Sequence, residues 1–356
     1  MICTISEGRT GLSDQDPPAG AAPHLAARCR QAMSVLCLLA LVLAAAGWAR
    51  ADARATRGPG IRRRAGSLGV LFTASPAPSP GPLPWLPAPQ PTPSPSPSPS
   101  PPPCPVHLRG FSCLMSERIR QAERYAAGRP GTIGIVLRNR LTGATWHNRF
   151  ARMDFPAAST IKLAMVADVM LRNDDGQIAL GPYDWNLIYN ILHESSDTAG
   201  DALWFAFEDG SFVDRIRQFG MRSTTFSSST AYWGYMYTSP ADLDNLMNFI
   251  LNKMPARNRD YIVGHLRHVA TIQQWGVWGA GREDRPGNKD GWEDNGDVWI
   301  TNTVGFAGPR ERYTLAIMDD VGGGETFHDG SNTLTQISSL LFSGHHAPQP
   351  RAVATP

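Results

Sequence analysis

The chain has 356 residues, a formal net charge of +2 and 42% hydrophobic residues, so its length allows one large or two small domains. Between positions 107 and 343 we count 23 Lys and Arg against 27 Asp and Glu, a net charge of −4, so the basic surplus lies outside this part. A nucleic-acid-binding domain needs a basic face, and we therefore expect no nucleic-acid partner.

The first 53 residues have the pattern of an export signal. An apolar run over positions 34–49 follows Arg28 and Arg30, and Ala-x-Ala sites occur at 49–51 and 51–53. The run is shorter than the roughly 20 residues of a spanning helix, so cleavage is expected and an uncleaved membrane tether is the alternative. Met33 is an alternative start. We predict a secreted or cell-wall-associated, extracytoplasmic protein.

Residues 54–105 form a basic and then proline-rich linker, with 16 prolines between positions 76 and 105. Such a segment builds no core and is predicted to be disordered, with polyproline II conformation that rises about 3.1 Å per residue and spans on the order of 90 Å. It either spaces a domain from a surface or is a solvated tail. Residues 106–345 are predicted to be one domain, followed by a disordered tail over 346–356.

The apolar pattern of 106–345 predicts an α+β fold. A helix capped by Ser116 and ending at Gly128 precedes strands at 132–138 and 144–148. Further helices are expected at 160–171, 183–193, 198–207, 212–219 and 241–254, followed by strands at 298–306 and 313–319 and a last helix at 332–341. This order predicts an antiparallel sheet flanked by the two terminal helices, plus an inserted all-helical subdomain.

Two of the five cysteines, Cys104 and Cys113, lie at the start of this domain. In an oxidising exterior they close a small disulfide loop, and two free thiols are the alternative. Two cysteines without a matching histidine pair are too few for a zinc site. We expect no metal and no other cofactor.

Lysine is rare in this chain, because only Lys162, Lys253 and Lys289 accompany thirty arginines. Arginine keeps its proton in proteins, whereas a desolvated lysine can release one. Lys162 stands three residues after Ser159 at the start of an apolar helix, so both side chains share one helix face. A neutral amine there can take the serine proton. The alternative is a capping serine with a surface lysine.

Two further motifs follow in order, Ser195-Ser196-Asp197 between predicted helices and Lys289-Asp290-Gly291-Trp292 before a predicted strand. Together with Ser159-x-x-Lys162, they give the chain a sequence that resembles the class A β-lactamases and penicillin-binding proteins, whose motifs are Ser-x-x-Lys, Ser-Asp-Asn and Lys-Thr-Gly. The resemblance covers nearly all of the predicted domain.

This resemblance implies four catalytic residues: Ser159 as nucleophile, Lys162 as its base, Ser195 as proton relay to the leaving nitrogen, and Lys289 as the source of a positive field. It also implies an oxyanion hole formed by the backbone N–H groups of Ser159 and Trp292. Gly291 then lets the strand backbone approach the acyl group closely.

Three departures from the family pattern bear on activity. Asp197 replaces an asparagine and can only accept hydrogen bonds. Asp290 replaces a Thr or Ser hydroxyl that binds the substrate carboxylate, so an anion there is expected to repel that group. The Ω-loop region, 221–237, contains no Glu or Asp to activate a deacylating water. We therefore expect inefficient hydrolysis of penicillins. Within this region Tyr232, Trp233 and Tyr235 either wall the pocket or belong to the core.

Three functions remain open. The first is a monomeric serine hydrolase that forms an acyl-enzyme on Ser159 with a small-molecule or peptidoglycan-derived amide or ester. In this interpretation Asp197, Asp290, Gly291 and Trp292 contact the substrate. The second is a non-catalytic descendant of the same fold that binds the cell wall. A true β-lactamase is the third.

Overall fold

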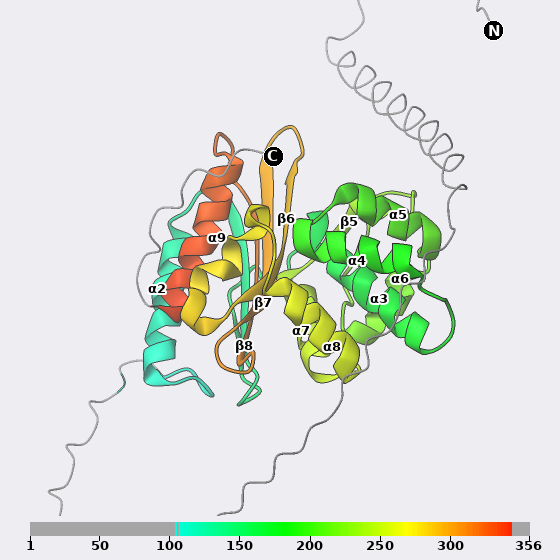
Figure 1. The fold of residues 1–356 in the computed structure, drawn as a ribbon. Helices are drawn as coiled ribbons and strands as arrows, with labels where there is room; N and C mark the ends of the chain where they lie inside the picture. Colours follow the sequence, from blue (N-terminus) through cyan, green and yellow to red (C-terminus); the bar gives the residue numbers. More distant parts are fainter. Residues whose placement is uncertain (1–103, 105–106, 344–356) are drawn as a thin grey trace, which may run out of the picture. The chain divides into compact units, whose positions relative to one another are not determined.

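The structure, a computed structural model, describes Cys104 and residues 107–343 (Figure 1). The expected export region, the C-terminal tail and all of the linker except Cys104 lie outside the described residues. Cys104 and Cys113 are joined by a disulfide with a Cα–Cα distance of 5.5 Å, which selects the bridge over two free thiols. Within the part of the chain that the structure describes, no helix is both long and apolar enough to cross a membrane.

The strands from both ends of the domain form one antiparallel sheet, with the order β2-β1-β8-β7-β6. These strands are β1 (Thr132–Asn139), β2 (Thr145–His147), β6 (Gly287–Asp294), β7 (Trp299–Ala307) and β8 (Tyr313–Asp320). The N-terminal β1 pairs along its whole length with β8, with Ile135 opposite Ile317. The polar edge strand β6 was not predicted; it contains the Lys289 motif, and Lys289 lies opposite Val304 of β7.

Two terminal helices cover one face of this sheet, α2 (Cys113–Ala127) and α9 (Phe327–Phe342) (Figure 1). They bury an apolar layer that includes Ile119, Ile317 and Leu334, and burial of this kind contributes about 25 cal/mol per Å². The α+β prediction is thereby confirmed. The cap of α2 is Ser112, whose side chain accepts a hydrogen bond from Met115 N–H. The predicted cap, Ser116, is instead buried inside the helix.

The other face of the sheet packs against a helical subdomain (Figure 1). Its helices are α3 (Lys162–Asp174), α4 (Pro182–Glu194), α5 (Asp197–Phe207), α6 (Phe212–Arg215), α7 (Pro240–Asn252) and α8 (Ala256–Leu266). All but α8 correspond to predicted helices. Every residue of α3 from Lys162 to Met170 is buried, so α3 is the central helix of this subdomain. Most of these residues are apolar, as expected for a helix in a central position, and the two charged ones, Lys162 and Asp168, have ion-pair partners.

Three short strands form a second sheet inside the helical subdomain, with the order β3-β5-β4. They are β3 (Phe155–Pro156), β4 (Thr225–Phe226) and β5 (Met236–Thr238). β3 directly precedes the turn that carries Ser159, and β5 ends the region 221–237. Pairing of Phe155 with Thr238 therefore fixes the start of the nucleophile turn against that region.

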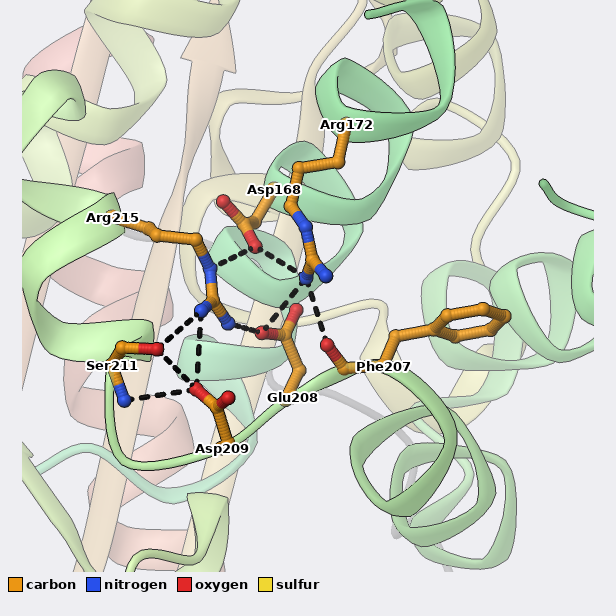
Figure 2. A network of polar contacts seen from close by, with 7 residues as sticks. All are labelled: Asp168, Arg172, Phe207, Glu208, Asp209, Ser211 and Arg215. Atoms are coloured by element: carbon orange, nitrogen blue, oxygen red, sulfur yellow. Dashed lines mark hydrogen bonds and ion pairs between the residues drawn. The ribbon is translucent and has the colours of Figure 1, made fainter. Parts of the chain in front are cut away.

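A buried ion network ties α3 to the α5–α6 connection (Figure 2). The carboxylates of Asp168 and Glu208 are fully buried and face the guanidinium groups of Arg172 and Arg215. Arg215 Nε lies 2.9 Å from Asp168 Oδ2, and another nitrogen of the same guanidinium contacts Glu208. Arg172 also donates to the backbone oxygen of Phe207 at 2.8 Å. The network fastens the end of α5 to the central helix.

Candidate active site

The candidate nucleophile lies in a tight turn. Ser159 belongs to the 3-10 helix η1 (Ala158–Ile161), which continues directly into α3. The preceding Ala158 has a φ of +45°, a left-handed conformation that costs energy in a residue with a side chain. Ser159 is 8% exposed, so its hydroxyl is nearly enclosed.

Lys162 reaches back along the helix to this hydroxyl. Its Nζ lies 3.0 Å from Ser159 Oγ, 2.9 Å from the backbone oxygen of Ser195 and 2.5 Å from Asp197 Oδ1. The side chain is completely buried. Close passage requires Gly200, because a Cβ at that position would lie 2.8 Å from Lys162 Cε. The ammonium head is therefore held among three oxygens with little freedom to move.

Two opposing influences act on the proton of this amine. Burial lowers the pKa of Lys162 from its ordinary value, while the carboxylates of Asp197 and Asp201 counteract part of that shift. The Nζ also lies 4.2 Å from the centre of the Trp233 ring, whose face favours a cation. A lowered pKa increases the fraction of neutral amine, which is the form that can accept the Ser159 proton.

The second motif places Ser195 at a sharp break between helices. Ser195 ends α4 with a left-handed φ of +62°. Ser196 caps α5, and its side chain accepts a hydrogen bond from Ala199 N–H. The two helices meet with a short connection, in which Ser195 is 5% exposed and its hydroxyl contacts Lys289 of the third motif.

Lys289 occupies the position of the third motif on β6. Its ammonium donates to Ser195 Oγ at 2.6 Å, to Gln273 Oε1 at 2.9 Å and to the backbone oxygen of Asp290 at 2.6 Å. Its side chain has no exposed surface. Burial lowers the pKa of Lys289 well below its ordinary value, and the nearby charge of Lys162 lowers it further.

Gln273, which belongs to none of the three sequence motifs, connects the second and third motifs. Its carbonyl accepts from Lys289 Nζ and from the Asp290 N–H, and its amide donates to the backbone oxygens of Leu192 and His193 at 3.0 Å. The side chain is fully buried with its amide group satisfied on both sides. Gln273 thus joins the edge strand to the end of α4, two to three residues before Ser195.

The edge strand approaches the nucleophile turn at Gly291. A Cβ there would lie 2.9 Å from Ser159 N and 2.7 Å from Thr160 N, so only glycine fits. Because the Asp290 N–H points out of the sheet toward Gln273, the Trp292 N–H, two residues further along, points to the same free edge. The backbone nitrogen of Ser159 lies next to the same part of the strand, because it is close to the Cβ position of Gly291.

Asp290 is placed differently from the sequence-based expectation. Side chains alternate along β6, so Lys289 and Gly291 face the helical subdomain while Asp290 and Trp292 face the layer beneath α9. Asp290 is fully buried beside Thr303, and burial raises the pKa of its carboxyl well above the ordinary range. Its side chain is therefore turned away from Ser159, so it does not stand where the expected repulsion of a substrate carboxylate would arise. The Trp292 ring packs on Trp275 and Phe327.

The region 221–237 lies beside Lys162 and brings aromatic side chains to the site. Tyr232 donates its hydroxyl to Asp201 Oδ1 at 2.5 Å, and Trp233 Nε1 donates to the same oxygen at 2.9 Å. Burial and this carboxylate raise the pKa of Tyr232. Trp233 is buried and forms part of the wall around Lys162, whereas Tyr235 is half exposed.

Of the eight predicted site residues, the structure links five through their side chains: Ser159, Lys162, Ser195, Asp197 and Lys289. A sixth, Gly291, approaches the Ser159 turn by its backbone. Asp290 takes part through its backbone, since its carbonyl oxygen accepts from Lys289 and its N–H donates to Gln273. The Trp292 side chain packs elsewhere, on Trp275 and Phe327.

The chain has the fold of class A β-lactamases and penicillin-binding proteins. A β-lactamase from Xanthomonas campestris superposes with a TM-score of 0.56 at 17% identity, covering 65% of this chain and 98% of that one. PBP-A superposes with a TM-score of 0.54 at 20% identity, covering 64% of this chain and 96% of the other.

Among curated proteins, the chain is similar to "Putative lipoprotein LppW" of Mycobacterium tuberculosis and of Mycobacterium bovis. The identity is 26% over 211 residues, which cover 56% of this chain and 67% of the relative. No protein-family model matches the chain.

Proposed function

We propose that this protein is an extracytoplasmic serine hydrolase that forms an acyl-enzyme on Ser159 with an amide or ester from the cell wall. The observation that carries the proposal is the 3.0 Å contact between Ser159 Oγ and a buried Lys162 Nζ whose pKa is lowered by desolvation. The lipoprotein name of the mycobacterial relative supports a place outside the cytoplasm. The proposed enzyme needs no cofactor.

In the acylation step, Ser159 Oγ attacks the carbonyl carbon while its proton moves to Lys162 Nζ. The developing oxyanion is stabilised by the backbone N–H groups of Ser159 and Trp292, a type of contact whose loss typically costs about 10²–10³ in rate. Collapse of the tetrahedral intermediate then breaks the bond between the carbonyl carbon and the leaving group, which takes a proton from Ser195 Oγ, held at 2.6 Å by Lys289. The proton taken up by Lys162 passes to Ser195 Oγ, so the Ser195 hydroxyl and the neutral amine are restored while Ser159 remains acylated.

A fluorophosphonate probe tests this assignment. We expect intact-mass analysis to detect one adduct on the wild-type protein, none on Ser159→Ala, and slow labelling of Lys162→Met. Ser227→Ala is the matched control, because this exposed serine bonds only within its own loop. A wild-type protein that stays unlabelled by the probe contradicts the proposal.

One observation favours a second candidate, a non-catalytic wall-binding protein. The 2.5 Å pair between Lys162 and Asp197 stabilises the ammonium form, which cannot act as a base. In that case the wild type is not labelled, and both it and Ser159→Ala sediment with isolated cell-wall material. A β-lactamase, in contrast, requires sustained turnover of nitrocefin, which the absence of an acidic residue in 221–237 disfavours.

A further inference from the structure

An enzyme that forms an acyl-enzyme acts as a hydrolase only if a base activates the water that releases the acyl group. In this chain the region 221–237 carries no Asp or Glu. Asp290 is buried on the opposite face of β6, and Asp201 is engaged with Tyr232 and Trp233. The carboxylate that remains next to the nucleophile is Asp197, whose side chain is 76% exposed.

Asp197 lies at a distance from Ser159 that one water molecule can bridge. Its Oδ1 is 2.5 Å from Lys162 Nζ, which is 3.0 Å from Ser159 Oγ, so Oδ1 and Oγ are at most 5.5 Å apart. A base must be within about 2.6–3.2 Å of the water it activates, and the water within about 3–3.5 Å of the carbon it attacks. Both conditions can be met together in this space.

The position of this carboxylate is well fixed despite its exposure. Asp197 is the first residue of α5, directly after the capping Ser196, and Lys162 Nζ holds Oδ1. One carboxylate oxygen is thereby anchored, while the exposed side chain leaves the group accessible to solvent. An asparagine at this position would present a weakly basic amide, which cannot take a proton from water.

We propose that Asp197 is the general base that hydrolyses the acyl-enzyme, in place of an acidic residue from 221–237. The water loses a proton to the Asp197 carboxylate, and its oxygen forms a bond to the acyl carbon. The bond between that carbon and Ser159 Oγ then breaks. The proton passes from Asp197 through Lys162 Nζ to Ser159 Oγ, which restores hydroxyl, neutral amine and carboxylate and releases the acyl group as an acid.

This inference rests on the proposed function, and p-nitrophenyl acetate separates the two. We expect the wild type to release a first equivalent of p-nitrophenolate and then to turn over. We expect Asp197→Asn to release the first equivalent at a rate within about tenfold of wild type, but to lose about 10²–10⁴-fold in deacylation, as is typical for loss of a general base. After gel filtration, the acetylated variant should persist in intact-mass spectra while acetylated wild type decays.

Asp214→Asn is the matched control. Asp214 also lies in the first turn of a helix, with a side chain that is 74% exposed, and its variant should acylate and deacylate like wild type. Asp197→Glu should recover part of the deacylation rate, because it keeps a carboxylate.

Two results overturn the role of Asp197 while leaving the nucleophile assignment intact. One is an Asp197→Asn protein that deacylates at the wild-type rate. The other is an equal loss of acylation and deacylation, which would show that Asp197 acts only through Lys162. A wild type that gives no acetyl adduct and no fluorophosphonate adduct overturns both proposals.

Discussion

Replacing Arg215 by methionine tests the buried network that holds α5 against α3 (Figure 2). The change keeps most of the side-chain length and removes the charge. Asp168 and Glu208 are both fully buried, and in the variant they share only Arg172, at 3.3 and 3.6 Å. Two carboxylates then face one cation in a low-dielectric site.

The expected loss in the free energy of unfolding follows from two carboxyl groups sharing one cation, and it depends on pH. Removing one partner of a buried ion pair typically costs about 3–5 kcal/mol. Burial, aided by the charge of Asp168, raises the pKa of Glu208 to about 8 in the native protein. Loss of Arg215 raises it further. A carboxyl with a raised folded-state pKa loses stability as pH rises, so the deficit of the variant should grow as pH passes through about 8.

Thermal unfolding of the full chain at about pH 6 and about pH 9, on either side of that pKa, measures the effect. For a domain of this size, 3–5 kcal/mol corresponds to a Tm lower by about 6–20 °C, and we expect this at the higher pH with a smaller loss at the lower. Arg217→Met is the control, because its pair with Asp214 is exposed and worth about 1 kcal/mol or less. Equal Tm values for the two variants at both pH values would refute the reasoning.

Two further perturbations have defined outcomes. Burial, with the charges of Asp320 and Glu325, raises the pKa of Asp319 to about 8, so native stability should fall between about pH 4 and pH 8. In Asp319→Asn, this loss in the free energy of unfolding should be smaller by up to about 5 kcal/mol, as measured by urea unfolding across that pH range. If the free energies of wild type and variant change with pH in parallel, Asp319 is not the group responsible. Gly291→Ala should lower the free energy of unfolding by about 1–3 kcal/mol and slow the labelling of Ser159 by the probe. Gly264 lies in open space on a helix, so Gly264→Ala should raise the free energy of unfolding by about 1 kcal/mol and leave the labelling rate unchanged.

Local sequence patterns were sufficient to predict most of the helices and the proximity of Ser159 to Lys162. Ser159 and Lys162 are three residues apart, and the 3-10 to α transition keeps both on one side of the turn. The strand pair β7–β8 and the central helix α3 follow from apolar runs that need no distant partner to be recognised. The predicted convergence of Ser195 and Lys289 relied on the resemblance to a known family.

Features formed by distant contacts could not be predicted in this way. The edge strand β6 has a polar sequence and becomes a strand because β7 supplies its hydrogen-bond partners. Since its sequence does not predict a strand, it also does not predict that Lys289 and Asp290 point to opposite faces. α8 is also polar and buries few apolar residues. Gln273 lies in a short 3-10 turn, and its partner Leu192 is 81 positions away.

The enclosure of Lys289 limits which changes the chain can tolerate there. Its ammonium donates to three oxygens, those of Ser195, Gln273 and Asp290, so one nitrogen supplies all three hydrogen bonds. Arginine, the cation this sequence otherwise uses almost exclusively, is a planar fork with five donors. A charge-preserving exchange to arginine would force donors into sites that have no acceptors. Lysine is therefore the cation that fits the geometry of these three acceptors.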